Sequence, residues 1–179
     1  SNTRGDLTIT GGSDILRYAL VASYYGERGI FVRDESKDWD SSTRLNKYNI
    51  RSNVDINVTK TTVVGISIGG YLQEKNGMAV SGQDVWNHAF ETPPFVHPIQ
   101  YSEGRDVRVR ERTNPWAEAT QHGYQTTSSS KVESLFSVEQ DLKFITPGLK
   151  FKGLFSFDRY SKSWVKRSRT PTYYNPATG

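Results

Sequence analysis

Three of the four tryptophans lie in long stretches that lack any strand pattern: Trp39, Trp86 and Trp116. An indole ring offers a broad apolar face and a single N–H donor, which suits stacking on sugar rings or on peptide side chains. These three residues are therefore the candidate ligand-binding residues of the chain. The alternative is that each ring anchors a small core inside its own loop, and the sequence leaves both interpretations open.

An acidic cluster, Asp34, Glu35, Asp38 and Asp40, falls in one of the same stretches. Calcium binding needs several oxygen ligands in one shell, and closely spaced carboxylates can supply them. The glycine and the terminal glutamate of an EF-hand loop are missing, and basic residues interrupt the run. The chain has no cysteine, and its three histidines are scattered. We therefore assign no metal site, and the alternative to calcium is a solvated loop.

No catalytic constellation is visible. The sequence contains no phosphate-binding glycine loop, no nucleophile elbow and no pair of acids with a supporting base. We predict a protein that is not an enzyme and that needs no cofactor. The net charge of +4 and the pI near 9.2 are mild, and a nucleic-acid partner would require a denser basic stripe.

Five basic residues gather near the end of the chain: Arg159, Lys162, Lys166, Arg167 and Arg169. If an apolar strand precedes them, they would lie just beyond the apolar layer of a membrane. Cations at that level attract anions such as lipopolysaccharide phosphates. The alternative is a hydrated extension of the strand.

The elements that must position these residues show strict alternation of apolar and polar side chains, most clearly from Tyr48 to Thr59. The apolar parity contains Tyr48, Ile50, Val54, Ile56 and Val58, and the polar parity contains Asn49, Arg51, Asn53, Asp55 and Asn57. Successive strand side chains point to opposite faces. One fully polar face indicates the wall of a water-filled lumen, in which case the other face meets lipid or a core.

The same alternation predicts six strands in three pairs, at about 6–25, 48–74 and 131–160. Connections of about four residues or fewer join the members of each pair, whereas long outer loops, 26–47 and 75–130, join the pairs. Short turns on one rim and long loops on the other are typical of outer-membrane barrels. The predicted fold class is therefore all-β: an antiparallel meander with long loops, part of a large outer-membrane β-barrel.

The longer loop contains signals of its own. Ser81 is a suitable N-cap for a helix over 84–90, which the Pro93-Pro94 pair would end. Asn114-Pro115 predicts a second helical turn, and the polar run 126–130 is interpreted as loop ahead of the fifth strand.

Several stretches together resemble a known family. They are Ile9–Ser13 with Arg17-Tyr18, Tyr24–Ile30, Tyr48–Asp55, Asn114-Pro115, Gln140–Leu142 and Gly148–Lys150. In their order and spacing, from Leu7 to about Tyr160, they resemble the barrel of a SusC/RagA-type TonB-dependent receptor, an outer-membrane nutrient-uptake transporter of Bacteroidetes.

The resemblance implies a large closed barrel in the cell outer membrane, of which six strands would be about a quarter. It also implies a plug and a TonB-contacting segment elsewhere in the protein, and a SusD-like lipoprotein partner on the long loops. The implied substrates are glycans or oligopeptides, which family members move without cleaving.

The chain of 179 residues begins Ser1-Asn2 without an initiator Met, so we interpret residues 1–179 as one partial barrel taken from a longer protein. No run approaches ~18 apolar residues, so no transmembrane helix is expected. The main alternative is a soluble all-β carbohydrate-binding module whose apolar faces pack on each other; a β-rich hydrolase is the third.

The phenylalanine stripe Phe151, Phe155 and Phe157 separates the first two interpretations. In a soluble sandwich these rings are buried within one chain. In a barrel fragment outer-membrane lipid would cover them, and without lipid we expect the isolated fragment to self-associate.

Overall fold

A computed structural model describes residues 1–93, 95, 97–109 and 112–175. Six long strands dominate the chain, and two α-helices, two very short strands and a 3-10 helix, η1 Ser102–Gly104, lie between the fourth and fifth of them. The elements are β1 Asn2–Gly12, β2 Leu16–Arg28, β3 Arg44–Asn57, β4 Thr62–Met78, α1 Gly82–Glu91, β5 Gln100–Tyr101, β6 Arg105–Asp106, α2 Pro115–Thr120, β7 Gly123–Asp141 and β8 Lys150–Ser168.

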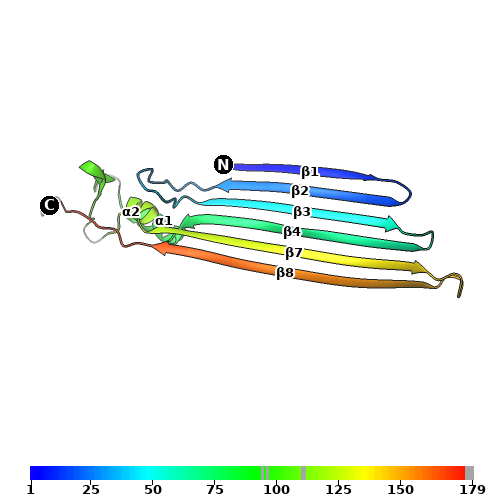
Figure 1. Ribbon diagram of the computed structural model, residues 1–179. Coiled ribbons are helices and arrows are strands. Elements are labelled where there is room, and N and C mark those ends of the chain that lie inside the picture. The colour runs from blue at the N-terminus through cyan, green and yellow to red at the C-terminus, as the bar shows by residue number, and fades with distance from the viewer. Residues whose placement is uncertain (94, 96, 110–111, 176–179) are drawn as a thin grey trace.

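The long strands form one sheet in the order β1-β2-β3-β4-β7-β8, with every neighbouring pair antiparallel. The predicted meander in sequence order is therefore confirmed. The connections 13–15, 58–61 and 142–149 lie at one end of the sheet, and the long loops 29–43 and 79–122 lie at the other, together with Ser1 and the segment 169–175 that follows β8 (Figure 1). The predicted segregation of short and long connections is also confirmed.

The register of the sheet gathers apolar side chains on one face. Tyr18, Val54, Ile66, Phe136 and Phe155 follow one another across five strands. Residues opposite each other in a ladder share a face, so the apolar parities of the separate strands combine into one continuous surface, which we call the apolar face. From Tyr48 to Asn57 the chain rises about 30 Å, or about 23 Å at ~40° tilt, close to the ~25 Å apolar band of outer-membrane barrels.

The opposite surface, the polar face, carries polar contacts between side chains of neighbouring strands and along single strands. Ser67 donates a hydrogen bond of 2.6 Å to Asn53, and the Lys47 ammonium lies 5.3 Å from the centre of the Tyr71 ring. Lys131 and Glu133 form an ion pair. The polarity is not complete, because Val21, Leu135 and Leu154 are exposed on this face.

The strands run further toward the long loops than the alternation predicts. β7 begins at Gly123, so the run 126–130, expected to be loop, is strand. It pairs with β4 on one side and β8 on the other. The backbone hydrogen bonds to these two strands hold the Thr and Ser residues in strand conformation, although the run is polar on both faces of the sheet. At 19 residues, β7 extends about 60 Å, well beyond an apolar band of ~25 Å.

The connection between β7 and β8 is longer than the expected four residues. β7 ends at Asp141, and residues 142–149 form the turn, with hydrogen bonds from the amides of Ile145 and Thr146 to the Leu142 carbonyl. These bonds coil the backbone locally instead of continuing the ladder. Gly148 adopts a φ of +84°, which favours glycine there.

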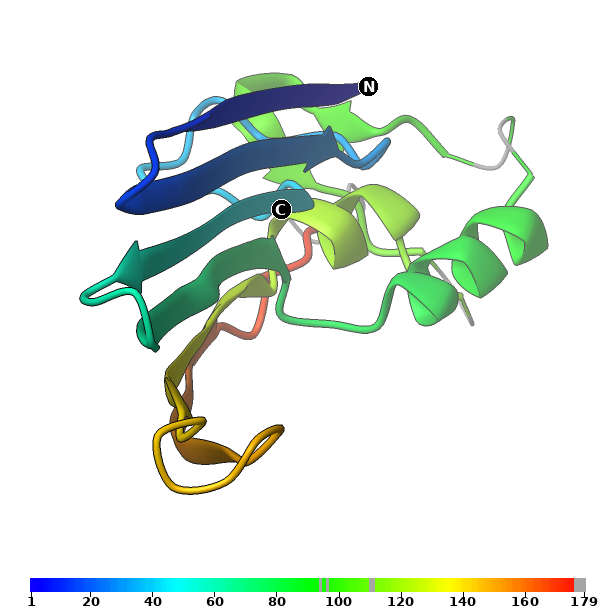
Figure 2. The same cartoon turned by 90° about the vertical axis from the view of Figure 1, so that its right-hand side faces the viewer.

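The helices predicted in the longer loop are present. Ser81 caps α1 by accepting a hydrogen bond from the Gln83 amide, and Asn114 caps α2. α1 ends at Glu91, before Pro93; Pro94 lies outside the described residues. Figure 2 shows both helices to one side of the strands, and neither is long and apolar enough to cross a membrane.

In a soluble sandwich the apolar side chains of the strands are buried, whereas in this chain they are exposed or half-buried. Among the described residues, the buried apolar side chains all lie in the long-loop region: Ala79, Val85, Val107, Ala117 and Ala119. By contrast, Phe151, Phe155 and Phe157 of β8 remain 56%, 65% and 58% exposed. In the described part of the chain no second layer covers the apolar face, which excludes the sandwich as the arrangement of this chain.

Candidate functional site

The loop 29–43 is fixed to the strands by polar contacts. Asp40 forms an ion pair with Arg44 at the start of β3. From β4, Asn76 donates hydrogen bonds of 2.9 and 3.0 Å to the carbonyls of Asp40 and Ser42, and it accepts one of 3.0 Å from Thr126 of β7. This network holds the chain immediately after Trp39 and so gives that ring a defined position.

Trp39 stacks on Tyr124 at the start of β7, with ring centres 6.2 Å apart and planes 23° apart. The two rings border a hollow of 460 Å³ that is otherwise lined by charged, amide and hydroxyl groups. Its other lining residues are Asp38, Asp40, Arg44, Asn46, Glu74, Lys75, Asn76 and Thr126. Aromatic faces beside hydrogen-bonding groups of both kinds suit a polyhydroxylated ligand, so of the three tryptophans Trp39 has the most complete binding surroundings.

The face to which this hollow belongs follows from the register. Asn46, Asn76 and Thr126 lie on the same parity as Tyr48, Leu72 and Val132 of the apolar face. The Trp39 hollow therefore lies on the same side of the sheet as the apolar face, at the long-loop end of the strands.

One ladder row that contains two tyrosines, which we call the tyrosine row, lies between the Trp39 hollow and the apolar face. Tyr24 and Tyr48 face each other across β2 and β3 with ring centres 5.2 Å apart, and the Tyr24 hydroxyl donates a 3.1 Å hydrogen bond to Asn46. Amphipathic aromatic rings at the edge of an apolar band are typical of a membrane–water interface.

Trp86 has different surroundings. It lies on α1, is 41% exposed, and stacks on Phe90 one helical turn further on, with ring centres 5.7 Å apart. Phe31 of the loop 29–43 approaches it at 6.1 Å. The Trp86 and Phe90 rings together present a stacked, exposed aromatic surface in the long-loop region.

Trp116 lies in α2 next to a buried asparagine that joins three segments. The Asn114 side-chain amide donates to the carbonyls of Val107 and Ile99 at 3.3 and 3.4 Å, and its oxygen accepts from the amides of Trp116 and Ala117. The Trp116 indole N–H is buried without a hydrogen-bond partner among the described residues. Trp116 therefore belongs to the packed loop core, in line with its loop-anchoring interpretation.

No ring contact within the described residues joins Trp39 to Trp86 or Trp116. The role of the three tryptophans in ligand binding stays a prediction, and each is considered by itself below.

Two members of the acidic cluster, Asp34 and Asp40, are engaged by protein donors. Asp34 accepts hydrogen bonds from Ser36 and, at 2.7 Å, from the Gln121 side chain. Burial raises the pKa of Asp34, but these bonds and the nearby Lys37 outweigh it and leave the pKa below its usual value. Over the described residues no group of three or more His, Asp or Glu side chains is placed to hold a metal ion.

The five basic residues near the end of the chain do not form a single surface. β8 pairing places Arg159 and Arg167 on the parity of the apolar face, whereas Lys162 and Lys166 lie on the polar face. Arg169 follows the end of the strand. Strand alternation splits any run of consecutive cations in this way.

A substitution in the loop core tests whether Asn114 organises it. We expect Asn114→Ala to destabilise α2 and the segment around Val107 by about 2 kcal/mol, because it removes a cap and leaves the carbonyls of the buried Val107 and of the exposed Ile99 without their donor. Ser81→Ala is the matched control: it removes an exposed cap and should cost about 0.5–1 kcal/mol, in α1 alone. Amide hydrogen exchange at Gln121 and Val85 reads the two helices separately, and equal losses in the two variants would contradict this role for Asn114.

Sequence reasoning missed most of the Trp39 hollow. Tyr124 and Thr126 were assigned to a loop because their neighbours are polar on both parities, so no alternation marks them as strand. The available signal was the parity of Val132 and Phe136. Continued toward the N-terminus through 130–124, it places Thr126 and Tyr124 on the same face.

The whole chain was compared with known proteins. No family model matches it. It is similar to the TonB-dependent receptor P3 of Formosa agariphila, with 27% identity over 172 residues. The match covers 88% of this chain but only 15% of that protein, so the chain spans a small part of its relative's length. The similarity supports a relationship to TonB-dependent receptors.

Proposed function

We propose that this chain is a segment of the barrel wall of a TonB-dependent outer-membrane receptor. The single observation on which the proposal rests is the open apolar face of a six-stranded meander whose long loops all lie at one end. Lipid would cover that face, and the polar face would line the water-filled lumen. The similarity to a TonB-dependent receptor supports the same conclusion.

Within this family we propose the SusC/RagA type of Bacteroidetes, and hence nutrient uptake. The support is the set of sequence stretches from Leu7 to about Tyr160 that resemble that type, together with the size of the loop 79–122. The cargo would be a glycan or an oligopeptide, imported with energy supplied through TonB.

The long-loop region would meet the cargo and a SusD-like lipoprotein. Trp86 and Phe90 are the exposed aromatic pair in that region, so of the three candidate tryptophans Trp86 is the one we assign to these contacts. Trp39 lies above the apolar face and would not touch cargo inside the barrel.

Uptake by the whole receptor tests this function. Deleting the gene should abolish import of one class of labelled oligosaccharide or oligopeptide, and a strain without TonB should show the same loss, because transport needs that energy source. Trp86→Ala should reduce uptake while the receptor remains in the outer membrane; the matched control is Trp116→Phe, which keeps an aromatic ring in the loop core. Unchanged import in both deletion strains would contradict the proposal.

We also propose that the protein catalyses no reaction. Screening the chain against glycosides and peptides should show no turnover that scales with protein concentration. Hydrolysis that disappears when one carboxylate is replaced would contradict this and favour the hydrolase.

A further inference from the structure

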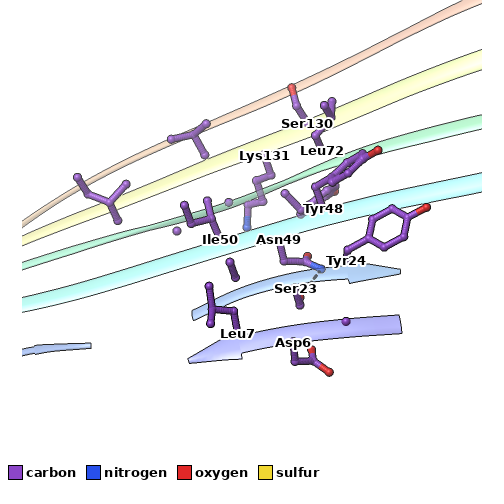
Figure 3. A pocket seen from close by; sticks show the side chains of 17 residues that line it. Asp6, Leu7, Ser23, Tyr24, Tyr48, Asn49, Ile50, Leu72, Ser130 and Lys131 are labelled. Carbon is purple, nitrogen blue, oxygen red and sulfur yellow. Dashed lines mark hydrogen bonds between the residues drawn. The ribbon is translucent and has the colours of Figure 1, made fainter. Parts of the chain in front are cut away.

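The apolar face contains a hollow of 860 Å³ beneath the tyrosine row (Figure 3). Its middle follows one row of the ladder, Leu7, Ala22, Ile50, Gly70 and Val132. The smallest members, Ala22 and Gly70, leave the depression between larger apolar neighbours. An apolar trough of this kind fits a hydrocarbon chain.

Two smaller polar hollows continue this trough toward the long loops. The first, of 370 Å³, is shared with the trough through Tyr24 and also contains Arg28, Arg44 and Asn46. The second is the 460 Å³ hollow of Trp39 and Tyr124, which shares Arg44 and Asn46 with the first. Through these shared residues one continuous strip leads from apolar to polar and then to aromatic surroundings.

The strip has an apolar end and a polar end, in the same order as the acyl chain and the head group of an outer-leaflet lipid. Apolar side chains occupy the end near the short turns, and the tyrosine row marks the level where the polar groups begin. On the proposed orientation the long-loop end faces the cell exterior. A lipid of the outer leaflet would then lie with its acyl chain in the trough and its head group toward Trp39.

We propose that this strip binds one glycolipid of the outer leaflet, with its acyl chain in the trough and its saccharide head group against the Trp39–Tyr124 pair. The inference rests on the proposed membrane orientation. The Trp39 ring would cover the apolar C–H face of a sugar, and the side chains of Asn46 and Glu74, which line the same hollow, would bind its hydroxyl groups. Arg28 would meet an acidic substituent of the head group, since guanidinium groups suit phosphate and carboxylate.

A saccharide head group fits the hollow better than a phosphate alone. Asp38, Asp40 and Glu74 line the hollow together with Arg44 and Lys75, and Arg44 is already paired with Asp40. The hollow is thus not a concentrated positive site. Stacking and hydrogen bonding to hydroxyls, the chemistry of sugar recognition, are what its residues offer.

Lipid binding to the full 179-residue chain in detergent micelles tests the proposal by native mass spectrometry. Three probes are compared: an acylated, phosphorylated diglucosamine glycolipid, the same saccharide after deacylation, and phosphatidylethanolamine. The glycolipid should bind about tenfold more tightly than either of the others, a difference of about 1.4 kcal/mol. Trp39→Ala should remove that preference and Trp39→Phe should retain most of it. The matched control is Trp164→Ala, which removes an exposed tryptophan from the polar face of β8 and should leave the preference unchanged.

The other outcomes have distinct meanings. Equal binding of glycolipid and phosphatidylethanolamine, in a chain that still inserts into phospholipid bilayers, would overturn the glycolipid site while leaving the proposed function intact. Equally tight binding of the deacylated saccharide would overturn the site as well, by showing that it holds soluble sugar. A chain that binds no lipid and inserts into no bilayer would overturn the proposed function itself.

Discussion

Replacing Phe136 with arginine is expected to lower the stability of the chain in a bilayer by about 2–4 kcal/mol. Phe136 lies near the middle of the apolar face and contacts Phe155, with ring centres 6.5 Å apart. On the lipid side of a barrel, a guanidinium near the bilayer midplane must leave water, and the cost falls to about 0–1 kcal/mol near the interfaces. Leu72→Arg, at the level of the tyrosine row, should therefore cost much less.

Leu135→Arg is the matched control for Phe136→Arg. The two residues are neighbours on β7, both apolar, and 41% and 42% exposed, but they point to opposite faces. If water lies against both faces, the two substitutions should differ by little more than the lost ring contact, about 0.5–1.5 kcal/mol. Urea titration of the chain in lipid bilayers measures both. Equal destabilisation by the two arginines would contradict a lipid-facing apolar surface.

Without lipid or detergent, we expect the chain to self-associate through the apolar face. The sheet exposes the large side chains of that face and leaves β1 and β8 as unpaired edges. Burying apolar area gains ~25 cal/mol per Å², and open edges recruit further strands. Light scattering in aqueous buffer should give a mass well above the monomer mass of 20.3 kDa. Detergent should return the monomer, because its tails replace the partner chain.

Substitutions on the two faces distinguish association through the apolar face from non-specific aggregation. Phe155→Asp and Phe157→Asp together should reduce association strongly, whereas Leu154→Asp on the polar face should leave it nearly unchanged. A stable monomer in buffer, with the three phenylalanines of β8 protected from solvent, would contradict the account and restore the soluble module.

The fold was predictable wherever one face of a strand is apolar and the other polar. Val54 and Ile66 show the pattern: alternation assigned both to strands, and the short turn between the strands fixed their pairing. The N-caps at Ser81 and Asn114 were equally readable, because capping is a local interaction between a side chain and the next turn of backbone.

Features that depend on contacts between distant segments were not predictable. Thr126 and Ser128 belong to β7 only because β4 and β8 pair with them, and no periodicity announces this. The bridge between Val107 and Tyr174 likewise joins residues that share no pattern. The Trp39 site required both the extended strands and the folded loop, so the sequence identified its tryptophan without its surroundings.

The surroundings of the side chains at 135 and 136 test the central claim most directly. The chain contains no cysteine, so Leu135→Cys and Phe136→Cys can each carry one fluorescent label without background. In bilayers, lipids that bear a quencher on the acyl chain should quench the label at 136, and iodide in the water should quench the label at 135. Quenching of both labels by iodide, with neither quenched by the lipid, would contradict the assignment of the apolar face to the membrane.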